Sequence, residues 1–124
     1  MAFKTMTILG GKGMLGTDLA VVASQRGLGV RIYDLPEFDI TDGKQLEAAV
    51  SGSEVIVNCA AYTNVEKAES EIELANQVNG YAVGRLGEIA KDAGVPVLHI
   101  STDFVFDGMK AGWLNPDAVI AFFA

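Results

Sequence analysis

The 124-residue sequence contains one cysteine, one histidine and three prolines. The single cysteine, Cys59, cannot form an intrachain disulfide, and such usage is typical of a reducing compartment. The single histidine, His99, has no companion ligands at metal-site spacing, so no metal is expected and His99 is predicted to be a packed residue. Basic residues are also scarce: nine face sixteen acidic ones, giving a formal net charge of −7. This balance argues against a nucleic-acid partner, which would require a basic face.

Long hydrophobic runs are missing as well. No apolar stretch approaches the length that spans a membrane, and Lys12 and Asp18 interrupt any signal-peptide core near the N-terminus. Together with the cysteine usage, this predicts a soluble, cytoplasmic chain without a membrane partner. Half of the residues are hydrophobic, as in a globular domain, and the length suffices for one such domain.

A glycine cluster is the most informative feature that is present. A short apolar run from Thr5 precedes it, and apolar residues at helical spacing follow it. The cluster fits G-x-G-x-x-G on Gly11, Gly13 and Gly16, or G-x-x-G-x-x-G if it begins at Gly10. In either alignment the glycines make a tight turn, admit a pyrophosphate and let a helix pack closely on a strand. The context of strand, glycine turn and helix predicts dinucleotide binding, with a ligand-free glycine turn as the alternative.

An acidic residue, Asp34, follows the second predicted strand, 30–33. It comes eighteen residues after Gly16, close to where a dinucleotide fold places the acid that binds the adenosine ribose hydroxyls. The alternative is an acid that caps the loop before Pro36. An aspartate here accommodates NAD at least as well as NADP, and Arg31, inside the strand, is not an obvious partner for a 2′-phosphate.

The order of the remaining segments predicts an α/β fold. A near-continuous apolar run at 54–61 is typical of a strand covered on both faces. A polar, loop-like stretch at 62–67 follows it, and another strand is expected at 95–100. The fold class is therefore a Rossmann-like doubly wound parallel sheet, incomplete, with about four to five strands and the order 2-1-3-4 for the main ones. The strand at 95–100 would then be an edge.

Two helices are expected between these strands. The first is short, begins at Thr41 or Asp42 as N-cap, and buries an apolar side of three residues: Leu46, Ala49 and Val50. The second is long, from about 69 to 92, with Asn79 on its apolar stripe. A buried amide needs partners, and Asn79 is equally interpretable as a tie to neighbouring backbone or as a direct site residue.

The same long helix contains Gly80, Gly84 and Gly87 on another face. Each glycine costs roughly 1 kcal/mol against alanine in a helix. A close approach of backbone to this face is therefore expected.

Three motifs make the pattern specific: 58–63 (Asn-Cys-Ala-Ala-Tyr-Thr), 65–69 (Val-Glu-Lys-Ala-Glu) and 101–108 (Ser-Thr-Asp-Phe-Val-Phe-Asp-Gly). With them the chain resembles, over residues 4–108, the N-terminal part of the dTDP-4-dehydrorhamnose reductases, which are extended short-chain dehydrogenases/reductases. The third motif usually has Tyr where this chain has Phe104. The resemblance implies reduction of a nucleotide-sugar 4-keto group with NADP or NAD as cofactor, in dTDP-rhamnose biosynthesis.

The resemblance also implies site residues. Thr102 would be the catalytic hydroxyl that holds the keto oxygen, and Asp103 and Phe104 would shape the sugar pocket together with it. The implied cofactor-binding residues are Gly10, Gly13, Met14, Leu15 and Gly16 at the pyrophosphate, Asp34 at the adenosine ribose, Asp39 and Ile40 at the adenine, and Ala60, Ala61, Tyr62 and Thr63 towards the nicotinamide.

One element of the family is missing from the sequence. The family's proton donor is the Tyr of a Tyr-x-x-x-Lys pair, and none of Tyr33, Tyr62 and Tyr81 has Lys four residues on. Family members run to more than twice this length. We therefore expect residues 1–108 to form an NAD(P)-binding domain and 109–124 to be a tail unlike the family. The chain would be a truncated form, inactive by itself.

Two other functions remain open. The chain can be a non-catalytic NAD(P)-binding module, because the regulatory subunit of methionine adenosyltransferase is similar to this family. It can also be another extended nucleotide-sugar reductase or epimerase. In each case the exposed edge strand at 95–100 predicts a homo-oligomer, unless the apolar segment 119–124 covers that edge.

Overall fold

The computed structural model describes residues 2–102 and residue 109, so the expectations for Asp103, Phe104 and the tail segment 119–124 lie outside the described residues. Within this described part, four parallel strands form one sheet in the order β2-β1-β3-β4. This confirms the predicted fold class and strand order. The strands are β1 (Thr5–Leu9), β2 (Gly29–Tyr33), β3 (Ile56–Asn58) and β4 (Val97–His99).

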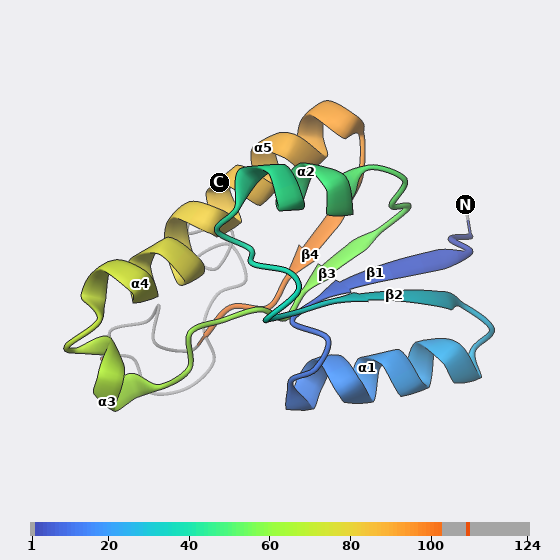
Figure 1. Ribbon diagram of the computed structural model, residues 1–124. Coiled ribbons are helices and arrows are strands. Elements are labelled where there is room, and N and C mark those ends of the chain that lie inside the picture. Colours follow the sequence, from blue (N-terminus) through green and yellow to red (C-terminus); the bar gives the residue numbers. More distant parts are fainter. Residues whose placement is uncertain (1, 103–108, 110–124) are drawn as a thin grey trace.

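Helices cover the two faces of this sheet (Figure 1). Helix α1 (Met14–Gln25) lies on one face, and α2 (Gly43–Val50) and α5 (Ala82–Ala93) lie on the other. Leu9 and Ile56 point to the α2 and α5 side, because they share one main core cluster with Leu46 and Leu86. Among the described residues, no helix combines the length and the apolar character that crossing a bilayer requires.

Strand β3 is shorter than the predicted run 54–61, for a local reason. The buried Asn58 turns its amide back on the chain, and its Oδ1 accepts a hydrogen bond of 3.1 Å from the backbone N–H of Ala60. The backbone N–H of Cys59 still donates to the Leu9 carbonyl of β1, and from Ala60 onwards the chain passes the glycine loop.

Of the two N-caps expected for helix α2, Thr41 and Asp42, the structure has Asp42. Its side chain accepts hydrogen bonds from the backbone N–H groups of Lys44 and Gln45.

The region predicted as a loop at 62–67 is partly helical, which corrects that expectation. A short helix, α3 (Val65–Ala68), begins after Asn64, whose side chain accepts a 2.9 Å hydrogen bond from the backbone N–H of Lys67. An asparagine N-cap satisfies one of the free donors at a helix start. Asn64 is therefore the sequence signal that identifies α3.

The long helix predicted at 69–92 is three consecutive helical segments. Helix α4 (Ile72–Asn76) passes into a π-helical turn, η1 (Gln77–Tyr81), and then into α5. A π turn contains more residues than an α turn and so rotates the face that packs on the core. The 3.6-residue spacing counted back from Asn79 puts Ile72 at the start of the predicted stripe, but Ile72 is 60% exposed, and the stripe is buried from Ala82 onwards.

The expectation for the three helical glycines is wrong as far as the described residues go. A Cβ built on Gly80, Gly84 or Gly87 would meet no described heavy atom within 4 Å. No backbone of the described part of the chain therefore approaches these glycines closely. The glycine after the helix is different: Gly94 ends α5 in the left-handed conformation at φ 68°, the usual end of a helix.

Candidate cofactor-binding site

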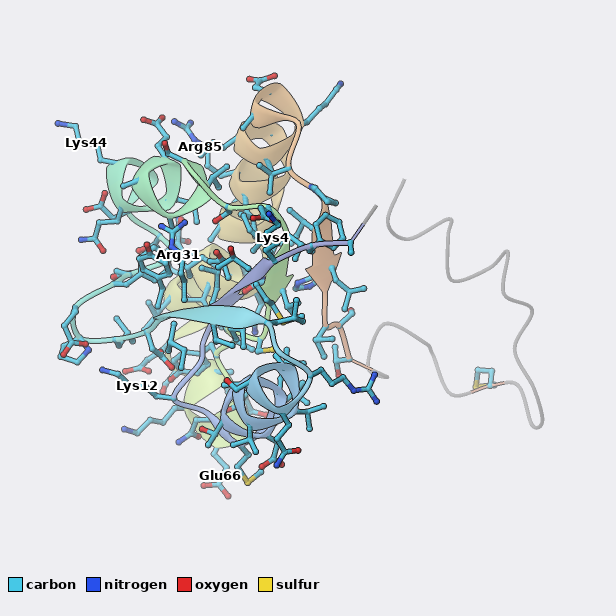
Figure 2. All side chains as sticks on the ribbon, turned by 90° about the vertical axis from the view of Figure 1, so that its right-hand side faces the viewer. Lys4, Lys12, Arg31, Lys44, Glu66 and Arg85 are labelled. Carbon is cyan, nitrogen blue, oxygen red and sulfur yellow. The ribbon has the colours of Figure 1, made fainter. Side chains whose placement is uncertain are left out.

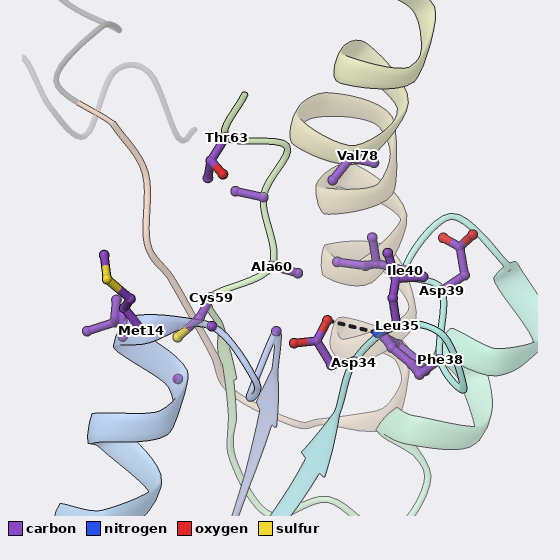
Figure 3. Close-up of a pocket in the computed structure, with 15 residues that line it drawn as sticks. Met14, Asp34, Leu35, Phe38, Asp39, Ile40, Cys59, Ala60, Thr63 and Val78 are labelled. Carbon is purple, nitrogen blue, oxygen red and sulfur yellow. Dashed lines mark hydrogen bonds between the residues drawn. The ribbon is translucent and has the colours of Figure 1, made fainter. Parts of the chain in front are cut away.

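The carboxyl ends of β1, β2 and β3 converge at one edge of the sheet (Figure 1). A cavity of about 520 Å³ opens there (Figure 3). In parallel sheets, ligands bind at this edge. The cavity brings together the expected cofactor residues with one exception, Tyr62. It is lined by Gly10, Gly13, Met14, Leu15, Gly16, Asp34, Asp39, Ile40, Ala60, Ala61 and Thr63, and by four residues that the sequence analysis did not assign to the cofactor, Leu35, Phe38, Cys59 and Val78.

The positions in the glycine loop require glycine for different physical reasons. Gly10 has φ 75°, and a Cβ there would lie 2.6 Å from the backbone nitrogen of Ala60. A Cβ on Gly16 would overlap the carbonyl oxygen of Gly10 and lie 2.7 Å from the Cα of Gly11. Gly10 and Gly16 are therefore required by close packing within the protein. This is the helix–strand approach expected of the motif's last glycine.

At Gly13, packing within the described part of the protein does not require a glycine. Its backbone is extended, with φ −73° and ψ 175°, a conformation open to any residue. A Cβ there would touch, among the described atoms, the Gly10 carbonyl oxygen at 3.4 Å and nothing nearer. Yet Gly13 lines the cavity, where an absent side chain leaves the backbone accessible. This free space fits the close approach of a pyrophosphate.

Helix α1 begins directly after Gly13, its N-cap. The first N–H groups of an α-helix have no partner inside the helix, and the helix dipole places partial positive charge there. The first turn of α1 contains no acidic residue to neutralise that charge. Since Met14, Leu15 and Gly16 line the cavity, this helix terminus can receive an anionic group such as a phosphate.

Asp34 stands on the opposite wall, at the end of β2 (Figure 3). Its Oδ2 accepts a 2.9 Å hydrogen bond from the backbone N–H of Lys12, and its Oδ1 accepts one of 2.8 Å from the N–H of Leu35. The carboxylate thus closes the glycine loop and also faces the cavity, which combines both interpretations of this residue. Each oxygen retains acceptor capacity for a hydroxyl.

Two apolar side chains form the next part of the wall. Phe38 and Ile40 are buried, and Phe38 packs edge to face on Tyr33 with ring centroids 5.3 Å apart. Asp39 is held between them, because its Oδ1 accepts from both the N–H and the hydroxyl of Thr41 at 2.9 and 2.7 Å. This surface suits a flat aromatic group. In the sequence, this apolar surface was indicated only by the position of Phe38 immediately before Asp39.

The segment after β3 is fastened to the π-helical turn. The Asn79 side chain accepts a 2.8 Å bond from the Tyr62 N–H and donates a 3.1 Å bond to the Tyr62 carbonyl. The Tyr62 hydroxyl donates to Glu71, which raises the pKa of Tyr62. Asn79 is exposed and not buried, so the tie to backbone is the interpretation that the geometry supports. Tyr62 itself is an anchor for the cavity wall formed by its neighbours Ala60 and Ala61.

The His99 ring is held by a hydrogen bond to the neighbouring strand β3. His99 Nδ1 lies 3.1 Å from Asn58 Nδ2, which can only donate, so Nδ1 accepts. Partial burial lowers the pKa of His99, which favours the neutral ring. Cys59, half-buried on the cavity wall, has its pKa raised by burial and is a poor thiolate. Within the described ranges, no cluster of three or more His, Cys, Asp or Glu side chains could hold a metal ion.

Thr102 is exposed and follows the end of β4 by three residues. It is at the same edge of the sheet as the cavity, although it is not among the described residues that line it. Its predicted neighbours in the sugar pocket, Asp103 and Phe104, lie outside the described residues.

A four-stranded parallel sheet, a glycine loop opening α1 and an acid after β2 define the class of Rossmann-like domains with a dinucleotide-type site. The family model described as "RmlD substrate binding domain" matches residues 4–120. The chain belongs to this family.

Individual relatives agree with this assignment. A dTDP-4-dehydrorhamnose reductase of Streptomyces griseus is 41% identical over 103 residues, which cover 82% of this chain and 34% of that protein. A dTDP-4-dehydrorhamnose reductase of Bacillus anthracis, solved in complex with NADP, superposes with a TM-score of 0.80 at 29% identity, covering 89% of this chain and 40% of that one. A hypothetical dTDP-4-dehydrorhamnose reductase of Sulfolobus tokodaii gives 0.80 at 35% identity, covering 91% and 44%. The chain thus spans about a third of the length of the curated relatives.

Proposed function

We propose that this chain is the NAD(P)-binding part of a reductase acting on the 4-keto group of a nucleotide sugar of the dTDP-4-dehydrorhamnose type. The observation that carries the proposal is the free space over Gly13, at the start of α1 and inside a cavity that Asp34 also lines. The names of the relatives and the NADP complex of the Bacillus anthracis protein support the same conclusion.

Each group of residues along the cavity is assigned to one part of the cofactor. The start of α1 and the bare backbone at Gly13 receive the pyrophosphate, and Asp34 accepts hydrogen bonds from the adenosine ribose. Phe38 and Ile40 give the adenine an apolar surface. Ala60 leaves room for the nicotinamide half because its side chain is small. The nicotinamide, when bound, supplies the hydride.

The substrate half of the reaction is assigned to the segment after β4. Negative charge develops on the keto oxygen as hydride arrives, so a hydrogen-bond donor is needed there. Thr102 supplies that donor, and Asp103 and Phe104 shape the sugar pocket. An alcohol orients the oxygen without readily giving up its proton near neutral pH. The proton donor therefore has to be another group, and the 124 residues contain no Tyr followed by Lys at the fourth position.

A second function shares this cofactor site: a non-catalytic module that binds NAD(P) without turnover. Another extended nucleotide-sugar reductase or epimerase would share the same cofactor site. Cofactor binding is common to all three functions, whereas reduction of dTDP-4-dehydrorhamnose by the whole protein belongs to the first alone.

The 124-residue chain should bind NADPH or NADH without reducing dTDP-4-dehydrorhamnose, because it lacks the proton-donating Tyr with its Lys. Binding is followed by cofactor fluorescence, and turnover by the loss of absorbance at the nicotinamide band with and without the sugar. Substrate-dependent oxidation that disappears in Thr102→Val would contradict the prediction about the acid. Absence of any binding would refute the cofactor function itself.

The chain should also self-associate, which extends the homo-oligomer expectation. Ile8, Val57 and Leu98 follow one row across the sheet, on the side of α1. Ile8 and Val57 are buried, whereas Leu98, on β4 at the edge of the described sheet, is 58% exposed. Burying such a side chain is worth about 1.5–3 kcal/mol. Light scattering after size exclusion should therefore show a species larger than a monomer.

The Leu98→Ser variant should shift that species towards the monomer. A matched control is Val65→Ser, which removes an apolar side chain that is 69% exposed from α3 and should leave the assembly unchanged. A wild-type chain that elutes as a stable monomer at micromolar concentration would rule out this assembly.

A further inference from the structure

One side chain of α2 supports the wall of the cofactor cavity from behind. Gln45, in the first turn of this helix, is not among the described residues that line the cavity, but it lines a second hollow beside it. Phe38 lines both hollows. Gln45 therefore lies on the far side of the wall that Phe38 contributes to the cavity.

The Gln45 amide holds the backbone of this wall. Its Oε1 accepts a 2.7 Å hydrogen bond from the N–H of Asp39, which belongs to the peptide that joins Phe38 to Asp39. The Asp39 carbonyl accepts a 3.0 Å hydrogen bond from the N–H of Asp42, the N-cap of α2. Both polar groups of the Asp39 backbone are thus tied to the beginning of α2.

The Gln45 side chain is itself held in one orientation. Its backbone N–H donates to Asp42 Oδ1 at 3.1 Å, and its Nε2 donates to Asp42 Oδ2 at 3.4 Å. Figure 2 shows the preceding residue, Lys44, pointing outward from α2. Successive side chains of an α-helix point about 100° apart, so the half-buried Gln45 faces the loop while Lys44 faces solvent.

The carboxylate of Asp39 keeps one oxygen available. Its Oδ1 accepts from the N–H and the hydroxyl of Thr41, whereas its Oδ2 accepts no hydrogen bond from the described part of the chain. Under the proposed function, Asp39 borders the adenine. A carboxylate can only accept hydrogen bonds, so it favours a base with an amino group at position 6 and disfavours one with a carbonyl oxygen there.

We propose that Gln45 is a positioning residue for the adenine: by holding the Asp39 N–H, it fixes the Asp39 carboxylate and the Phe38 ring against the base and makes the site prefer adenine to hypoxanthine. The inference rests on the proposed cofactor function. Without the Gln45 oxygen the partly buried Asp39 N–H has no acceptor. A donor left unpaired in this way is costly, so the loop moves to find another partner and the carboxylate loses its place.

The test compares the affinities of the full chain for NADH and for its hypoxanthine analogue, in which a carbonyl replaces the 6-amino group, by fluorescence titration without substrate. The wild type should bind NADH about tenfold more tightly, as expected for one hydrogen bond to a charged group. Gln45→Met should weaken NADH binding by about tenfold and leave binding of the analogue within about twofold, so that the preference disappears. Methionine is similar in length and favours helix. Gln45→Ala should give the same ratio and serves as the second variant.

Two further variants separate positioning from a general structural effect. Gln45→Glu keeps an acceptor for the Asp39 N–H and should retain the preference, since its added charge acts on both nucleotides alike. Lys44→Met places the same methionine one position earlier, where the side chain points outward, and should leave the ratio at the wild-type value. Urea unfolding shows that each variant is folded.

The outcomes that overturn the inference differ from those that overturn the cofactor function. If Gln45→Met weakens both nucleotides equally, or Gln45→Glu loses the preference as fully as Gln45→Met, Gln45 supports the fold and does not position the base. A ratio unchanged in Gln45→Met, or a wild type without preference, also overturns the inference, while NADH binding upholds the cofactor function. If the wild-type chain binds neither nucleotide, the proposed function fails and the inference fails with it.

Discussion

Gly13→Val is expected to abolish binding of NADH and NADPH while the protein stays folded. The branched side chain would occupy the open space at the start of α1, where the pyrophosphate is proposed to approach the backbone. Forcing such an overlap costs about 3 kcal/mol, which corresponds to about a hundredfold loss of affinity. Fluorescence titration of both nucleotides measures the loss directly.

The fold should tolerate this substitution because the backbone at Gly13 is extended and its nearest described neighbour would be 3.4 Å from the new Cβ. Valine is a poorer N-cap than glycine, so a loss of up to about 1 kcal/mol in the free energy of unfolding is expected. Gly13→Ala, with its smaller side chain, should show intermediate affinity. Equal NADH binding by the wild type and Gly13→Val would refute the assignment of this position.

Gly16→Ala should have the opposite profile, with a large loss of stability in the absence of any nucleotide. The new Cβ would overlap the Gly10 carbonyl and lie 2.7 Å from the Gly11 Cα, and backbone atoms cannot move away as a flexible side chain can. Overpacking of this kind costs about 1–3 kcal/mol or more. It outweighs the gain of about 1 kcal/mol that alanine brings to a helix. Urea unfolding of the apoprotein gives the difference.

The matched control is the same substitution on α5. A Cβ on Gly84 would meet no described atom within 4 Å, so Gly84→Ala should raise the free energy of unfolding by about 0.5–1 kcal/mol. The two variants thus differ in sign although both replace a helical glycine by alanine. Equal stability changes in both would show that packing between Gly16 and Gly10 does not hold the loop.

These variants also mark where sequence reasoning stops. The sequence predicted one glycine motif with three functions, and it could not say which glycine serves packing and which serves a ligand. The answer depends on what lies opposite each Cα. For Gly10 this is the backbone of Ala60, fifty positions further on, and for Gly13 it is open space. Distances of this kind exist only in the folded chain.

The sequence by itself determined the strand order, the glycine loop before α1 and the acid after β2, and it narrowed the cap of α2 to Thr41 or Asp42. The strands and the loops after them are encoded locally, by apolar runs that end at a glycine or an acid. The strand order follows because right-handed crossovers leave few arrangements for such runs. The tertiary structure alone decided which helix faces pack, because the π turn shifts them. It also decided that Asn79 holds Tyr62 and that Lys12 pairs with Glu37. These contacts join residues 17 and 25 positions apart, and only the packed sheet brings such residues within hydrogen-bonding distance.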